Sequence, residues 1–152
     1  MTRLDQIEFE ADLTCPFCAI VRGADKTAEL VCDGSDWLAF FPHEPATPGH
    51  TLVIPRRHVP NLWVANDELA RSLMSAVLKV GRAISEVVQP DGMNLITSAG
   101  AAAEQTVYHL HLHVVPRWVR DPIDPIWPPK KRMTEQILEN LAEELRSACS
   151  RL

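Results

Sequence analysis

One short segment constrains the fold of this chain more than any other: Tyr-His-Leu-His-Leu-His-Val-Val-Pro, which ends at Pro116. Its histidines, His109, His111 and His113 (the histidine row), alternate with apolar residues. A β-strand would place all three imidazoles on one face, whereas a helix would spread them around its axis. We therefore predict a strand that ends at Pro116, because proline cannot donate to a sheet ladder. The side chains expected on its buried face are Tyr108, Leu110, Leu112 and Val114.

Length and composition predict one globular domain, residues 1–152. The chain is 46% hydrophobic and 23% charged, with a net charge of −5, which is typical of a soluble protein with a substantial core. The negative charge argues against broad binding to nucleic acid or to anionic membranes. No apolar run is long enough to span a bilayer, and the N-terminal residues lack the apolar core of a signal peptide. We therefore expect a cytosolic location, where the four cysteines stay reduced.

The remaining secondary structure follows from apolar periodicity and turn residues. The further expected strands are Glu29–Cys32, Trp37–Phe41, Thr51–Ile54 and Met93–Thr97. A long helix is expected from a cap at Asn66 or Asp67 to a stop at Pro90, with an apolar stripe along it. Thr134 can cap a last helix, whose expected buried face carries Leu138, Leu141, Leu145 and Ala148. This order, with short connections, predicts an α+β fold in which an antiparallel sheet has its helices on one side.

Taken by itself, the histidine row is compatible with three interpretations. Two imidazoles at positions i and i+2 of a strand can chelate one metal ion. An imidazole whose tautomer is fixed by a second group can be a nucleophile. The third interpretation is a set of ordinary exposed histidines on an edge strand. Because a strand rises about 3.3 Å per residue, the first and last histidines lie roughly 13 Å apart at Cα, so one ion can hardly bind all three.

The histidine row resembles the signature of the histidine triad (HIT) family, His-φ-His-φ-His-φ-φ, where φ is apolar. The resemblance covers roughly residues 13–118 and leaves 119–152 as a C-terminal arm and helix. The other matching segments are Cys15-Pro-Phe-Cys18-Ala-Ile, Leu38-Ala39-Phe40, Pro48-Gly49-His50-Thr51-Leu52-Val53-Ile54-Pro55-Arg56-Arg57-His58 and Gln105-Thr106-Val107-Tyr108. The resemblance implies an α+β fold with a long central helix, a homodimer, and a nucleotide hydrolase or transferase that cuts at an α-phosphate.

The resemblance also implies roles for single residues. His111 would attack the α-phosphorus and form a nucleotidyl-imidazole intermediate, while its other ring nitrogen donates to a backbone carbonyl. His113 would donate to a non-bridging phosphate oxygen. His50 would support the hydrogen bonds of the triad from behind, the alternative being an ordinary core histidine. Gln105 and Thr106 would hold the phosphate and the leaving group.

Cys15 and Cys18 form a C-x-x-C pair, which is half of a structural zinc site. Such a site usually needs four nitrogen or sulfur ligands, so histidines must supply the rest. Some zinc-bearing members of the family use the histidine that ends the Ile-Pro-x-x-His stretch and the first triad histidine, which here are His58 and His109. The resemblance therefore implies a closed, structural Zn²⁺ site, with the other two triad histidines left to face the substrate.

The same Cys-Pro-Phe-Cys pair is similar to the redox pair of glutaredoxins. A redox fold needs the pair between a strand and a helix of a βαβ unit, and the residues before Cys15 form a poor buried strand. The zinc interpretation of the cysteine pair is therefore the stronger one.

No G-x-S-x-G, Walker A or G-x-G-x-x-G motif occurs in the chain.

Some positions depart from the family pattern. Members that bind adenosine usually carry an aspartate after the Leu-Ala-Phe strand to hold the ribose, and the corresponding residue here is Pro42. His43 or Glu44 would have to substitute for it. In the loop before the triad, Ser98 and Glu104 stand where the family often has an asparagine and a glycine. The charge of Glu104 near the phosphate would disfavour highly charged polyphosphates.

These features predict a hydrolase of nucleoside phosphoramidates or dinucleoside polyphosphates, with His43 and Ser98 as further substrate contacts. The alternatives are a nucleotidyltransferase or phosphorylase of the same family, and a nucleotide-binding scaffold protein with incidental hydrolysis. Trp127 lies in the proline-rich segment Arg117–Pro129. It could stack on a base, but we favour an anchor buried in the core.

Overall fold

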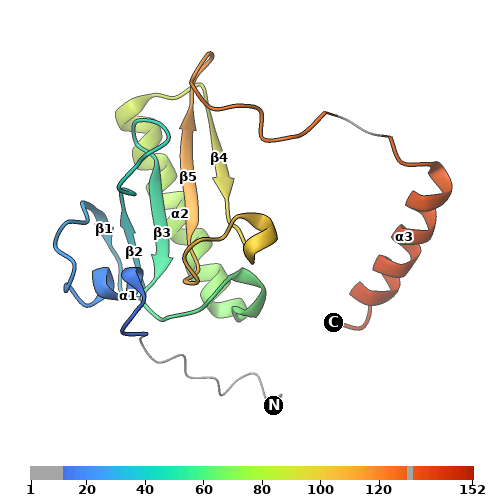
Figure 1. Ribbon diagram of the computed structural model, residues 1–152, viewed down its shortest axis with the longest axis horizontal. Helices are drawn as coiled ribbons and strands as arrows, with labels where there is room; N and C mark the ends of the chain where they lie inside the picture. The colour runs from blue at the N-terminus through green and yellow to red at the C-terminus, as the bar shows by residue number, and fades with distance from the viewer. Residues whose placement is uncertain (1–11, 130–131) are drawn as a thin grey trace. The chain divides into compact units, whose positions relative to one another are not determined.

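The computed structural model describes residues 12–129 and 132–152, so the N-terminal sequence considered above lies outside the described residues. The described chain divides between Pro122 and Ile123 into two compact units. The first unit carries the sheet and the histidine row, and the second carries the C-terminal helix (Figure 1).

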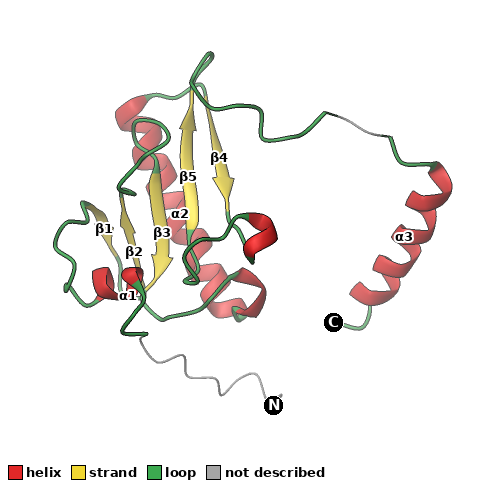
Figure 2. Cartoon of the chain, in the orientation of Figure 1, coloured by secondary structure: helices red, strands yellow, loops and turns green. Residues whose placement is uncertain are grey.

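The first unit is built on a five-stranded antiparallel sheet, as predicted (Figure 2). In spatial order its strands are β1 (Leu30–Asp33), β2 (Trp37–Phe40), β3 (Thr51–Pro55), β5 (Leu112–Arg117) and β4 (Gly92–Ile96). Four of them lie within one residue of the ranges predicted for them. The histidine strand differs more and is described below. Together with the long helix, this sheet confirms the α+β fold class.

Helix α2 (Asp67–Val88) covers one face of the sheet and contacts β2, β3 and β5 (Figure 1). Its N-cap is Asn66, whose side chain accepts from the backbone N–H of Leu69. It ends at Gln89, whose left-handed backbone precedes Pro90. The predicted apolar stripe packs against alternate side chains of the strands. The buried residues of this core are Trp37, Ala39, Val53, Val59, Leu73, Ala76, Val77, Val80, Ile84, Leu110, Leu112 and Val114.

Helix α1 (Pro16–Val21) packs on the opposite face, so the prediction that all helices lie on one side is wrong. Its residue Ile20 is buried together with side chains of β2 and β3 that point away from α2. Covering both faces explains why every residue of these two central strands is buried. This helix could not be predicted from apolar periodicity, because six residues are too few to display a helical period.

Strand β5 begins at Leu112, which is later than predicted. The chain before it bends towards another segment, since the N–H of Leu110 donates to the carbonyl of Val59 at 2.6 Å. Tyr108 lies in this bend with 52% of its surface exposed, so its predicted place in the core is wrong. The predicted stop at Pro116 is also wrong, because β5 continues to Arg117.

Pro116 fits inside the strand because no residue of β3 lies opposite it and needs an N–H donor. The backbone N and O atoms of one strand residue point towards the same neighbouring strand, and the pairing of β5 with β3 stops at Val114, before Pro116. Its carbonyl instead accepts from the hydroxyl of Thr47 at 2.8 Å. On its other side β5 pairs with β4, with Pro116 opposite Met93.

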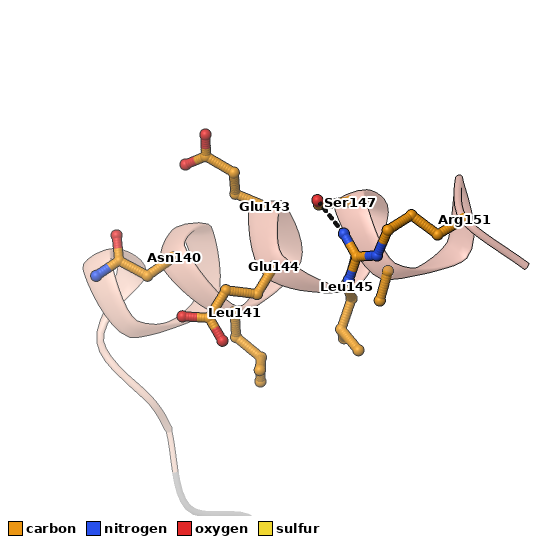
Figure 3. Close-up of a pocket in the computed structure, with 8 residues that line it drawn as sticks. Asn140, Leu141, Glu143, Glu144, Leu145, Ser147 and Arg151 are labelled. Carbon is orange, nitrogen blue, oxygen red and sulfur yellow. Dashed lines mark hydrogen bonds between the residues drawn. The ribbon is translucent and has the colours of Figure 1, made fainter.

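The second unit consists mainly of α3 (Glu135–Cys149), which Thr134 caps as predicted. The prediction of a buried face is wrong: Leu138, Leu141 and Leu145 are 45–55% exposed. An apolar stripe indicates that a helix needs a partner surface but not which one, and the described residues of this unit form no second helix or strand against which α3 could pack. The groove in Figure 3 is lined by side chains of α3 and by Arg151, which follows it in the chain, so it is an open surface along this one helix.

Trp127 is 83% exposed, which contradicts its interpretation as an anchor buried in the core.

Among the described residues, no helix is long and apolar enough to cross a bilayer.

Candidate active site and metal site

The histidine row lies on the face of the sheet opposite α2, and its members share that face as predicted. His113 pairs in the ladder with Leu52, which belongs to the core on the α1 side. Phe17 of α1 stands edge-on to the rings of His109 and His111, with centroids 5.9 and 5.4 Å away. The row is therefore held between the sheet and α1, and the alternative of ordinary exposed histidines does not describe it.

Four residues from three segments bring their ligand atoms within 4.8 Å of one another: Cys15, Cys18, His58 and His109 (the metal cluster). The Nδ1 atom of His109 lies 3.5 Å from both sulfur atoms, and that of His58 lies 3.3 Å from the sulfur of Cys18. Two thiols and two imidazoles can hold one metal ion. These are the residues that the sequence nominated as ligands.

Each segment presents its ligand for a local reason. Cys15 is the N-cap of α1, and one helical turn carries Cys18 to the same side. His109 is fully buried, and its Nε2 lies 2.9 Å from the carbonyl of Pro55, at the end of β3. Because a carbonyl can only accept, the ring proton lies on Nε2 and the lone pair on Nδ1 faces the cysteines. Burial lowers the pKa of His109 to about 4, which keeps the ring neutral.

This geometry also weighs against a redox pair. The segment that follows α1 leads into β1, which pairs antiparallel with β2, so the described residues form no βαβ unit around the cysteine pair.

His111 is oriented by the backbone of its neighbour. Its Nδ1 lies 2.7 Å from the carbonyl oxygen of His109, so this nitrogen carries the proton and donates. The remaining ring nitrogen, Nε2, is then unprotonated. Burial lowers the pKa of His111, which favours the neutral imidazole. A neutral ring with a fixed tautomer and a bare Nε2 is the form in which histidine is a nucleophile.

His113 and His50 form a second pair beside it. The Nδ1 of His113 lies 2.9 Å from Nε2 of His50, and the ring centroids of His113 and His111 are 5.0 Å apart. Burial, together with the neighbouring imidazoles, lowers the pKa of His113 to about 4. Burial also lowers the pKa of His50. His50 is thus a direct hydrogen-bond neighbour of His113, and the supporting role that the resemblance implies for it stays a prediction.

Gln105 is buried, and its amide group is fully engaged with the backbone. Its oxygen accepts from the N–H of Gly100 at 2.8 Å, while its two N–H groups donate to the carbonyls of Pro60 and Val107 at 2.6 and 3.0 Å. In this arrangement the amide closes the loop before the triad and has no N–H left for a phosphate. Its neighbour Thr106 is exposed.

The other candidate contacts lie on segments next to the triad. The hydroxyl of Thr97, after β4, donates to the carbonyl of His111 at 2.9 Å, which brings the adjacent Ser98 to the same region. His43 is exposed on the loop that also carries His50. Glu104 is exposed and has a left-handed backbone (φ 62°). The sequence did not single out Phe17 or Thr97, because a ring that packs and a hydroxyl that binds a carbonyl belong to no motif.

Comparisons with known proteins agree with this site. A family model described as the HIT domain matches residues 24–119. The chain belongs to the HIT family. Protein hit of Bacillus subtilis is 39% identical over 114 residues, which are 74% of this chain and 78% of that protein. The adenylylsulfatase HINT3 of Arabidopsis thaliana is 35% identical over 107 residues, which are 70% of this chain and 54% of that protein.

Solved structures of HIT proteins share the fold. A crystal structure from Streptococcus mutans UA159 has a TM-score of 0.86 at 34% identity, covering 93% of this chain and 90% of that one. A zinc-bound histidine triad family protein from Mycobacterium smegmatis has a TM-score of 0.69 at 34% identity, covering 89% and 97%. A hypothetical histidine triad nucleotide-binding protein from Sulfolobus tokodaii has a TM-score of 0.67 at 31% identity, covering 91% and 93%.

Proposed function

We propose that this HIT protein is a nucleotidyl hydrolase that cleaves at the α-phosphate of nucleoside phosphoramidates or dinucleoside polyphosphates. The observation that carries the proposal is the orientation of His111, whose Nδ1 is committed to the carbonyl of His109. Its Nε2 is therefore the bare, neutral nitrogen that nucleophilic attack on phosphorus requires. Membership of the HIT family, with a nucleotide-binding protein and an adenylylsulfatase among the similar proteins, supports the substrate class.

The reaction would run in two displacements at phosphorus. Nε2 of His111 forms a bond to the α-phosphorus while the bond to the leaving group breaks, and the leaving group takes the electron pair and a proton from the solvent. Water then attacks the same phosphorus, gives up a proton, and displaces the histidine as the nucleoside monophosphate leaves. His113, beside His111, would stabilise the phosphoryl oxygens through a hydrogen bond.

We propose that the metal cluster holds a structural zinc ion. Tetrahedral zinc with bonds of about 2.3 Å to sulfur and 2.0–2.1 Å to nitrogen places S and N ligands roughly 3.5 Å apart. The S···N distances of 3.3–3.5 Å fit that geometry. With four protein ligands the ion would keep no open position, so it would fasten α1 to the histidine row and take no part in the chemistry. The zinc-bound relative is consistent with this choice of metal.

Of these two substrate classes, phosphoramidates with a small, weakly charged leaving group are proposed as the preferred one. Glu104 lies in the loop before the triad, and its carboxylate would repel a long polyphosphate chain. Substrate contacts are proposed for Thr106, Ser98 and His43. A phosphate contact by Gln105 would require its amide to give up a backbone carbonyl, so we assign Gln105 chiefly to shaping the loop.

We further propose a homodimer that pairs through β4 and α2. Strand β4 stands at one end of the described sheet, and a groove beside it is lined by residues of both elements. Leu78 and Leu95 line this groove and are 53% and 45% exposed. An apolar patch next to an unpaired strand edge is a surface that a second copy can cover. The proposed setting is the cytosol, where the free cysteines stay reduced.

The test is release of nucleoside monophosphate from a panel of phosphoramidates and dinucleoside polyphosphates by wild type and His111→Asn. Turnover that the substitution abolishes supports the nucleophile, and the panel ranks the leaving groups. Diphosphate formed after adding inorganic phosphate would identify a phosphorylase instead. Tight binding of a monophosphate by a folded dimer without turnover would favour the scaffold alternative.

A further inference from the structure

The backbone N–H of Ala46 donates to Nδ1 of His50 at 3.0 Å. A ring nitrogen that accepts a hydrogen bond carries no proton, so the single proton of neutral His50 lies on Nε2. That proton points at Nδ1 of His113, 2.9 Å away, which must then be the acceptor. The proton of neutral His113 consequently lies on its own Nε2. The backbone N–H of Ala46 thus determines which nitrogen donates and which accepts in the hydrogen bond between His50 and His113.

The turn that carries this amide is tied to the strand that carries His113. Thr47 is 4% exposed, and its hydroxyl donates to the carbonyl of Pro116 in β5 at 2.8 Å. The carbonyl of Thr47 accepts from the N–H of His50 at 3.0 Å. Thr47 therefore connects the backbone at His50 with the strand that carries His113. A change in the turn should alter the hydrogen bond between the two imidazoles.

The turn also depends on Gly49, whose backbone is left-handed (φ 85°). A Cβ at this position would come within 3.4 Å of the ring of Pro116 and would carry the strain of that backbone conformation. The glycine lets the turn lie closely against β5, within reach of the Thr47 hydroxyl.

We propose that Ala46 and Thr47 form a positioning turn: they set the tautomer of His50 and thereby make Nε2 of His113 a proton donor towards the substrate. The inference rests on the proposed function, because it supplies the donor that a phosphoryl oxygen or a departing group needs. If instead Nδ1 of His113 donated to Nε2 of His50, Nε2 of His113 would carry a lone pair and would repel the anionic phosphate. Ala46 and Thr47 touch no substrate themselves, so they act only through His50.

The first test reads the tautomers directly in the zinc-loaded, full-length protein. Long-range ¹H–¹⁵N spectra distinguish a protonated ring nitrogen from a bare one, and they need no substrate. In the wild type, His50 and His113 should both carry their protons on Nε2. Ala46→Pro removes the N–H, so a population of His50 protonated on Nδ1 should appear. Ala46→Gly keeps the N–H and should keep the wild-type tautomer.

A second pair of variants covers the case in which Ala46→Pro fails to fold. Thr47→Val keeps the shape of the buried side chain but loses the bond to Pro116, whereas Thr47→Ser keeps the hydroxyl. Thr47→Val should shift the tautomer of His50 and lower kcat for a phosphoramidate roughly tenfold, with KM changed about twofold at most. Thr47→Ser should restore the tautomer and most of kcat.

The outcomes separate this inference from the proposed function. Unchanged His50 and His113 signals in folded Ala46→Pro and Thr47→Val would overturn the positioning turn, whether or not the protein turns over substrate. Shifted tautomers in those variants support it. If the wild type then releases no monophosphate from any substrate, the proposed function fails while the structural inference stands.

Discussion

The carbonyl oxygen of His109 lies 2.7 Å from Nδ1 of His111, while the ring of His109 faces the sulfur atoms of the metal cluster. One residue therefore belongs to the metal cluster through its side chain and orients the candidate nucleophile through its backbone. Its burial leaves it no room to move independently of either neighbour. We expect the stability of the metal cluster and the activity of His111 to be coupled.

The first prediction concerns metal removal. Chelation, or Cys18→Ser, should lower Tm by about 10 °C, because the proposed metal would fasten α1 to the histidine row and its loss would remove a few kcal/mol. Turnover should fall as well, since the carbonyl that orients His111 loses its support. Cys149→Ser, at an exposed position outside the metal cluster, is the control and should behave as wild type. A Tm that is unaffected by chelation, with metal absent by elemental analysis, would contradict the structural role.

The second prediction is a pH dependence of stability that resides in His113. Its pKa falls from about 6.5 in an unfolded chain to about 4 in the folded protein. Between these values the unfolded chain binds more protons, so His113 contributes stability that is complete above pH 6.5 and is lost as pH falls towards 4. The contribution at neutral pH is of the order of 2–3 kcal/mol.

Urea unfolding at pH 7 and at pH 5 measures this contribution. Wild type should lose more unfolding free energy between the two pH values than His113→Asn, because asparagine does not titrate. The metal cluster is the same in both proteins, so any effect that it has on stability cancels in the difference. Equal losses in the two proteins would show that His113 is not the group responsible.

The third prediction separates Gln105 from Thr106. Gln105→Ala should lower the free energy of unfolding by about 2 kcal/mol, because it strips buried backbone groups of Gly100, Pro60 and Val107 of their partners. Thr106→Ala, at an exposed position, should change it by less than about 0.5 kcal/mol and yet lower turnover if its hydroxyl contacts the substrate. Equilibrium unfolding and steady-state kinetics of both variants decide the matter. Similar stability for the two would argue that Gln105 does not hold the loop together.

The fourth prediction tests the dimer. Leu95→Glu and Leu78→Glu place charges on exposed apolar positions beside the β4 edge, so a monomer should tolerate them while a dimer should dissociate. Sedimentation should show a dimer for wild type and monomers for these variants. Val87→Glu, also on α2 but 78% exposed and outside the groove, is the matched control and should remain dimeric. Dimers that persist in both groove variants would move the interface elsewhere.

Much of the fold was accessible from sequence because its signals are local. Period-two and period-3.6 patterns mark the strands and α2, and Asn66 and Thr134 cap their helices by bonds that reach three residues along the chain. The errors occur where a distant contact overrides the local pattern. Tyr108 faces solvent because the chain bends towards Val59. Pro116 continues a strand because the pairing of β5 with β3 stops at Val114.

The sequence by itself determined which residues are the candidates for chemistry: the alternation of histidines with apolar residues, and the spacing of the two cysteines, restrict their side chains to particular faces and ligand sets. Only the tertiary structure decided the protonation pattern that makes them a site. The carbonyls of Pro55 and His109 and the N–H of Ala46 fix the three ring tautomers. Almost every residue carries such backbone groups, so the residue types in a sequence do not indicate which of them will contact a histidine ring. Their effect arises only when folding brings them within hydrogen-bond distance.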